Sequence, residues 1–146
     1  MKTDKRTSQI VYRIRLESPA DKVFALLATD RGRESFWAER SSQNGDEITF
    51  SFSNGEKLQS RILESSPPRR FSLTYFNGSI VTFDIEEMSS GTRVKMQETH
   101  LSASDENQNR AGWVSVLLNL KARADHGIDL RNHNPEYTWS DGYVDN

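Results

Sequence analysis

The sequence contains no cysteine among its 146 residues. Disulfide bonds, thiolate metal sites and cysteine nucleophiles are therefore excluded. It also has no apolar run near the roughly 18 residues that a membrane-spanning helix needs, so we expect no membrane insertion. Lysine and arginine together number 19, against 21 aspartate and glutamate residues, which gives a formal net charge of -2. Since nucleic-acid-binding proteins carry a basic surface, we expect no nucleic-acid partner.

Length and the first residues set the expected domain organisation and compartment. A chain of this length suits one compact domain, which we place over residues 1–146, with residues 129–146 as a tail packed on the body. The opening segment MKTDKRTSQI has no apolar centre of the kind a secretory signal needs, which favours a cytoplasmic protein. Hydrophobic residues make up only 34% of the chain, a low share that favours a thin or hollow core.

The first part of the chain predicts one strand and two short helices. Strict alternation over residues 9–17 puts the apolar residues of this segment on one face, as in a half-buried strand. The next segment, SPADKVFALLATD, predicts a helix that Ser18 caps and Pro19 begins. Asp30 is expected to cap a second short helix that ends at the following Phe-Trp pair.

Closely spaced turn signals dominate the middle of the chain. Asn-Gly pairs occur three times, and this pair is a strong hairpin signal because both central residues of a type I′ turn need positive φ. The runs between the turns alternate with a period of two. They predict about six antiparallel strands, over residues 38–42, 47–53, 57–64, 71–76, 80–86 and 92–101.

The last regular element is a long amphipathic helix near residues 112–126, which ends at Gly127. Its apolar residues recur at helical spacing. They are Trp113, Val116, Leu117, Leu120 and Ala124. A sheet with one apolar face needs a cover, and no other long helix is predicted. We therefore predict an α+β fold in which a curved antiparallel sheet of about seven strands holds this helix across its concave side.

Two segments of the chain resemble a known family. SPADKVFALLATDRGRESFWAE and GWVSVLLNLKARADHGIDLRN are similar to the first helical segment and the C-terminal helix of proteins related to the activator of heat-shock protein 90 ATPase. The order of elements resembles the helix-grip (START/Bet-v-like) fold of the START-like, polyketide cyclase or SRPBCC superfamily. The resemblance extends from residue 11 to the end of the chain. It implies that unfilled volume beneath the helix forms a ligand pocket.

The resemblance implies binding of a small, largely apolar ligand in that pocket, with no cofactor and with a role in stress response. The ligand is expected to be aromatic, polyketide-like or lipid-like. Two alternatives stay open: a cyclase- or hydrolase-like enzyme that uses polar cavity residues, and a co-chaperone that activates a chaperone ATPase. The expected ligand-binding residues are Tyr12, Phe24, Phe36, Trp37, Phe50, Phe52, Tyr75, Phe83, Met96, Glu98, His100, Trp113 and Leu117.

Glu98 and His100 are the candidates for catalysis. They continue the predicted inward face of Val94 and Met96, and two positions along a strand separate their Cβ atoms by roughly 6–7 Å. Both can then touch one ligand and act as general base and acid. The alternative is that the strand end reaches the rim of the sheet, where both side chains are solvated.

The histidines and the aromatic residues of the tail give two further expectations. His100, His126 and His133 have no metal-ligand spacing among themselves, so we expect no metal site. Tyr137, Trp139 and Tyr143 lie among polar residues near the end of the chain. A disordered tail is poor in aromatic residues, so we expect some of these rings to dock on the body near the pocket mouth.

Overall fold

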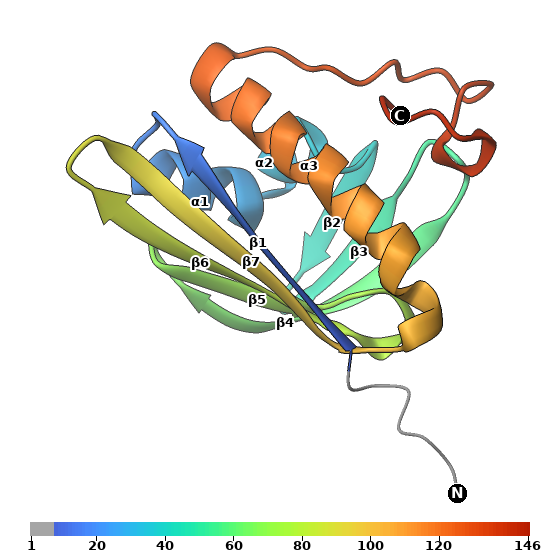
Figure 1. The fold of residues 1–146 in the computed structure, drawn as a ribbon, viewed down its shortest axis with the longest axis horizontal. Helices are drawn as coiled ribbons and strands as arrows, with labels where there is room; N and C mark the ends of the chain where they lie inside the picture. The colour runs from blue at the N-terminus through green and yellow to red at the C-terminus, as the bar shows by residue number, and fades with distance from the viewer. Residues whose placement is uncertain (1–7) are drawn as a thin grey trace, which may run out of the picture.

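The computed structural model describes residues 8–146, and these form one seven-stranded antiparallel sheet with the order β1-β7-β6-β5-β4-β3-β2 (Figure 1). The strands are β1 (Ser8–Leu16), β2 (Arg40–Asn44), β3 (Glu47–Ser51), β4 (Lys57–Ser66), β5 (Arg70–Thr74), β6 (Ile80–Met88) and β7 (Gly91–Leu101). Residues 1–7 lie outside the described residues. They belong to the single domain predicted over residues 1–146 and to the opening segment in which we expect no secretory signal.

Three α-helices and three short 3-10 turns accompany the sheet. They are α1 (Ala20–Ala28), α2 (Asp30–Glu34), α3 (Glu106–His126), η1 (Phe76–Gly78), η2 (Ala103–Asp105) and η3 (Trp139–Asp141). The long helix α3 runs diagonally across the concave side of the sheet (Figure 1); α1 packs against α3, and α2 packs against α1 and β2. The predicted helix-grip fold is confirmed. No helix of residues 8–146 is both long and apolar enough to cross a membrane.

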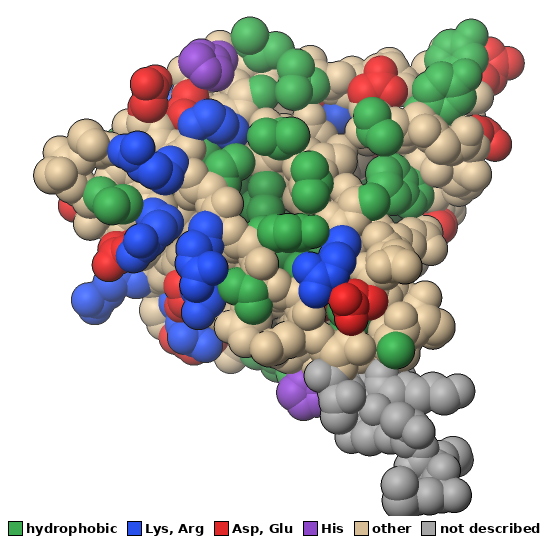
Figure 2. All heavy atoms as spheres, viewed as in Figure 1, with side chains coloured by type: hydrophobic (Ala, Val, Ile, Leu, Met, Phe, Trp, Pro, Cys, Tyr) green, Lys and Arg blue, Asp and Glu red, His purple; other side chains and the backbone are tan. Residues whose placement is uncertain are grey.

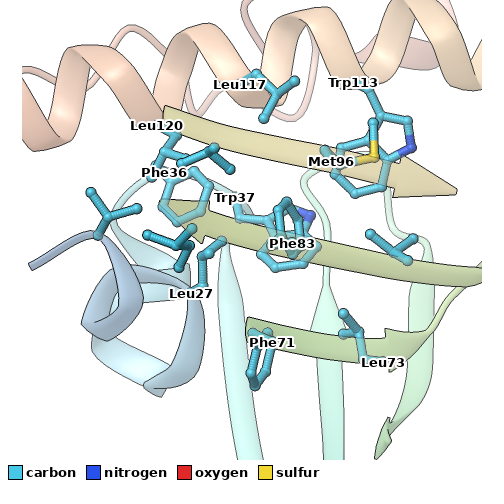
Figure 3. Packing of buried hydrophobic residues seen from close by; sticks show 14 of the residues in the cluster. Leu27, Phe36, Trp37, Phe71, Leu73, Phe83, Met96, Trp113, Leu117 and Leu120 are labelled. Atoms are coloured by element: carbon cyan, nitrogen blue, oxygen red, sulfur yellow. The ribbon is translucent and has the colours of Figure 1, made fainter. Parts of the chain in front are cut away.

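The centre of the space between α3 and the sheet is solid core. Trp113 and Leu117 project from α3 toward Phe83 and Met96 of the sheet, and all four side chains are buried (Figure 3). The ring centroid of Trp37 lies 5.7 Å from that of Phe83 and 6.0 Å from that of Trp113. Burial of each such side chain contributes about 1.5–3 kcal/mol, so this packing stabilises the grip of the sheet on the helix.

Ser18 does not cap α1 as predicted; it connects the start of α1 to the end of α3. Pro19 occupies the N-cap position of α1. The Ser18 hydroxyl lies 2.7 Å from the carbonyl oxygen of Ala124 and 2.8 Å from the carboxylate of Asp125. Because Asp125 also accepts a hydrogen bond from the Ser18 backbone N–H at 3.0 Å, this contact holds the two helices together.

The second short helix is capped by Thr29, and the prediction that Asp30 caps it is wrong. The Thr29 hydroxyl oxygen accepts a hydrogen bond from the Gly32 N–H at 3.0 Å. Asp30 instead accepts hydrogen bonds from Arg33 at 2.9 Å and from Ser41 at 2.8 Å. The Arg33 side chain is fully buried, so these partners offset the cost of removing its charge from water.

The turn between β6 and β7 has room only for glycine. Gly91 has φ +98°, and a Cβ atom placed there would lie 2.2 Å from the carbonyl oxygen of Leu16. We expect Gly91→Ala to lower the free energy of unfolding, measured in urea, by about 3 kcal/mol.

Gly45→Ala is the matched control, because Gly45 has φ +62° but a Cβ there meets nothing within 4 Å. Gly45→Ala should lower the free energy of unfolding by only about 1 kcal/mol, the cost of a positive φ for a residue with a Cβ atom. Equal losses in the two variants would show that the close approach of Leu16 is unimportant.

Candidate functional site

A buried carboxyl group lies at one end of the core. Glu98 of β7 is fully buried and accepts hydrogen bonds from three side chains. The Ser79 hydroxyl donates at 2.5 Å and the Trp113 indole N–H at 2.9 Å. The Asn109 amide lies 3.2 Å from each carboxyl oxygen. These bonds connect β7 to α3 and to the loop before β6.

His100 does not share the inward face of Glu98, and the prediction that it does is wrong. A bulge interrupts the pairing of β1 with β7, because Ile10 pairs with Glu98 whereas Ser8 pairs with Leu101. His100 takes a positive φ of 57° at this bulge. The extra residue makes Leu101 the next buried position and leaves His100 exposed. The structure therefore does not bring Glu98 and His100 to one ligand.

An open pocket of about 250 Å³ lies beside the buried carboxyl group, between α3, the loops after β3 and β5, and the tail. Its rings are Trp37, Phe52, Tyr75, Phe76, Trp113 and Trp139. Its polar rim consists of Asn54, Glu56, Asn77, Asp105, Gln108, Asn109, Ser115 and Asn146. Mostly apolar walls with a few polar groups are typical of sites for small organic ligands.

Only part of the predicted ligand-binding set lines this pocket. The lining members are Trp37, Phe52, Tyr75 and Trp113. Those in the solid core are Phe24, Phe36, Phe50, Phe83, Met96 and Leu117. Tyr12 lies half-buried on β1, where the Arg110 guanidinium carbon is 6.0 Å from its ring centroid. Glu98 itself does not line the pocket, but its hydrogen-bond partners Asn109 and Trp113 do.

The polar rim cannot be predicted from the sequence. Asn54 and Asn77 belong to Asn-Gly pairs that predict turns, and no spacing in the sequence relates them to Gln108 or Asn146. These residues meet because the curved sheet brings two loops and the tail to the same end of α3 (Figure 1). Of the tail aromatics, Trp139 lines the pocket.

Tyr75 is the polar group among the pocket rings. Its hydroxyl oxygen accepts a hydrogen bond from the Trp37 indole N–H at 3.2 Å. Burial raises the pKa of the Tyr75 hydroxyl above its usual value, and the negative charges of Glu98 and Glu56 act in the same direction. The hydroxyl therefore stays protonated near neutral pH and keeps one hydrogen to donate.

Arg131 anchors the tail to the segment that carries Trp37. Its buried guanidinium donates to the carbonyl oxygens of Ala38 at 2.9 Å and Glu34 at 2.7 Å. It also pairs with Asp129 at 2.9 Å. Hydrogen bonds of this kind to a charged donor are each worth about 1.5–3 kcal/mol, so this end of the tail is held firmly.

Further contacts hold the last residues of the tail against the pocket. The Ser115 hydroxyl of α3 donates to the carbonyl oxygen of Val144 at 2.8 Å. Asn54 donates to the Ser140 hydroxyl at 3.2 Å, and Asn146 donates to the Ser53 hydroxyl. These bonds keep the tail, including Trp139 and Asn146, in the pocket wall.

Within residues 8–146, no group of three or more potential metal ligands comes together.

Family comparison places the chain among relatives of a chaperone activator. Residues 17–125 match the family described as activator of Hsp90 ATPase homolog 1-like protein, and the chain belongs to this family. The family suggested by the two sequence segments is thus confirmed. No curated protein matches the chain.

Solved structures share the fold. The Aha1 dimer from Colwellia psychrerythraea superposes with a TM-score of 0.76 at 21% identity, over 83% of this chain and 98% of that one. A protein from Staphylococcus saprophyticus superposes with a TM-score of 0.72 at 24% identity, over 83% of this chain and 94% of that one. DynU16, a putative protein of the dynemicin biosynthetic locus, gives 0.71 at 16% identity, over 82% of this chain and 48% of its own.

Removal of the buried carboxyl group should destabilise the protein. Glu98→Ala leaves the donors of Ser79, Asn109 and Trp113 without their acceptor and opens a cavity, so we expect a loss of about 3 kcal/mol in urea unfolding. The indole N–H signal of Trp113 should also shift in NMR spectra. The control is Glu87→Ala, at an exposed position of β6, where we expect a change below about 0.5 kcal/mol. Similar losses in both variants would contradict the role assigned to Glu98.

The attachment of the tail should depend on pH through His133. Its Nδ1 and Nε2 atoms each lie 2.7 Å from a carboxylate oxygen, of Glu39 and Asp129 respectively. The hydrogen bond to Asp129, with help from Glu39 and against the charge of Arg131, raises the pKa of His133. Although burial acts upward, hydrogen bonds from Arg131 lower the pKa of Asp129 to about 2, so Asp129 stays ionised near neutrality.

Because the folded pKa of His133 lies above the unfolded value of about 6.5, its stabilising effect is full below that pH and is lost as pH rises through the folded pKa. We expect wild type to be more stable than His133→Gln at about pH 5.5, and the difference to shrink by about pH 9. Urea unfolding of both proteins at each pH measures it. A difference that does not change with pH would contradict this assignment.

Proposed function

We propose that this protein binds a small aromatic molecule in the open pocket at the N-terminal half of α3. The observation that supports the proposal is the pocket wall, in which six aromatic rings surround about 250 Å³ and a polar rim borders them. This volume lies just below the roughly 300–1,000 Å³ of pockets for drug-sized ligands. It therefore suits a molecule of one or two rings better than a long lipid chain or a large polyketide.

The arrangement of the rings also favours a flat ligand. The centroids of Tyr75 and Trp113 are 5.1 Å apart, and those of Phe52 and Phe76 are 5.7 Å apart. The two pairs are tilted, with interplanar angles of 35° and 38° respectively, and aromatic pairs at such separations gain about 0.5–1.5 kcal/mol beyond the area buried. A planar ligand can extend this ring cluster, while the Tyr75 hydroxyl and the Asn109 amide orient it.

Gly112 offers a way to close the pocket without harming the fold. It lines the pocket, and a Cβ atom at this position would meet nothing within 4 Å. Gly112→Leu should keep or raise stability, because leucine is favoured over glycine in a helix by roughly 0.8 kcal/mol. We expect it to weaken binding of small aromatic compounds at least tenfold.

The experiment is an NMR titration of the labelled protein with a library of one- and two-ring compounds. The chain has 3 tryptophans, and all of them line the pocket, so their indole N–H signals report occupancy. Val114→Leu, on the exposed side of the same helix, is the matched control and should bind as wild type does. Unchanged binding by Gly112→Leu would place the ligand elsewhere.

A second function, activation of a chaperone ATPase, is favoured by the family and by an apolar band on the outside of the molecule. Hydrophobic side chains gather over the region of α3 and the tail (Figure 2). The exposed large hydrophobic side chains of α3 and the tail, which we call the apolar band, are Val114, Leu118, Ile128, Leu130, Tyr137, Tyr143 and Val144. Such bands mark protein interaction surfaces. Gly112→Leu leaves the apolar band intact. If the function is activation of a chaperone ATPase, this variant should stimulate an Hsp90-type ATPase as strongly as wild type does.

A further inference from the structure

The charged side chains of the pocket all have one sign. Among the described residues that line it, Glu56 and Asp105 are charged, and none is lysine, arginine or histidine. The carboxyl group of Glu98 lies behind the same wall, within hydrogen-bond distance of the pocket residues Asn109 and Trp113. An anionic ligand would lose its hydration here without meeting a positive charge, which is costly.

The two rim carboxylates lack a neutralising partner within the described part of the chain. Glu56 accepts a hydrogen bond from the Asn54 amide at 3.0 Å, and Asp105 accepts from Asn77 at 3.1 Å. These are uncharged donors. Three other carboxylates of α3 and the tail are paired with cations, in Glu106–Arg110, Lys121–Asp125 and Asp129–Arg131. The negative potential at the pocket mouth is therefore not cancelled locally.

Three of the rings that line the pocket with these carboxylates pack against one another as a cluster. The centroids of Trp37 and Tyr75 are 6.0 Å apart, those of Tyr75 and Trp113 are 5.1 Å apart, and those of Trp37 and Trp113 are 6.0 Å apart. A cation within about 6 Å of a ring face gains roughly 0.5–2 kcal/mol, most of all with tryptophan. An ammonium group at the pocket mouth would meet the two rim carboxylates, with these aromatic rings close behind them.

We propose that the pocket selects small aromatic molecules that carry a protonated amine or a quaternary ammonium group, and that it rejects carboxylate ligands such as fatty acids. This inference rests on the proposed function, since it names the ligand class of the same pocket. The ring of the ligand stacks in the aromatic wall, and its cationic group points to Glu56 and Asp105 at the mouth.

The test uses three probes that share one ring system and differ in charge: 2-naphthylmethylamine, 2-naphthalenemethanol and 2-naphthoate. Each is titrated into the labelled wild-type protein, and the indole N–H signals of Trp37, Trp113 and Trp139 are followed. We expect the amine to bind about tenfold more tightly than the alcohol and the carboxylate to bind most weakly. The preference for the amine should fall as salt is added, because the rim carboxylates are accessible to ions.

The double variant Glu56→Gln/Asp105→Asn should bind the alcohol as wild type does and lose most of its preference for the amine. Its control is Asp21→Asn/Glu87→Gln, which makes the same change in net charge at exposed positions outside the pocket lining and should keep the preference. Glu56→Gln alone, at an exposed position, tests the same point if the double variant does not fold.

The outcomes separate the inference from the function on which it rests. If the alcohol or the naphthoate binds as tightly as the amine, or if the double variant keeps the full preference, charge selection is wrong while the pocket still binds aromatic molecules. If none of the three probes shifts an indole signal, the proposed function fails together with the inference.

Discussion

The acceptor site that Glu98 provides is the constraint on which the rest of the structure depends. A buried carboxyl group is costly unless its hydrogen bonds are made. Its donors on α3 are Asn109 and Trp113, which are four residues apart and therefore lie on one face of the helix. Both can reach Glu98 at only one rotation and one position of α3 along the sheet. An apolar stripe alone would let the helix slide, whereas this contact fixes where its side chains enter the core.

Trp113 carries that constraint into both the core and the pocket. One part of its ring packs against Trp37 and Phe83, with centroids 6.0 and 5.9 Å away, and another part borders the open volume. Toward the C-terminal half of α3, smaller aliphatic side chains fill the gap, and Leu120 is fully buried. The low hydrophobic content favoured a thin or hollow core, whereas the space under the helix is solid at its centre and is bordered by the pocket at one end.

Much of the fold was readable from the sequence because strand alternation and Asn-Gly turns are local signals. The parity of β7 holds through Glu98, whose burial follows from its even spacing after Val94 and Met96. The alternation fails at His100, where β7 has a bulge. The pairing of β7 with β1 sets the position of this bulge, and no residue pattern in β7 itself marks it. The rim of the pocket was unreadable for a related reason: its residues come from loops that only the tertiary structure brings together.

The hydrogen bonds of Arg131 have a consequence for the proposed ligand site. The carbonyl groups that it holds, those of Glu34 and Ala38, flank the short segment from which Trp37 enters the pocket. Tail attachment and occupancy of the pocket thus share a structural element, since Trp139 of the tail stands in the same wall as Trp37. Thermodynamic coupling between them is reciprocal. If a bound molecule changes the equilibrium constant for docking of the tail by some factor, docking of the tail changes the affinity for that molecule by the same factor.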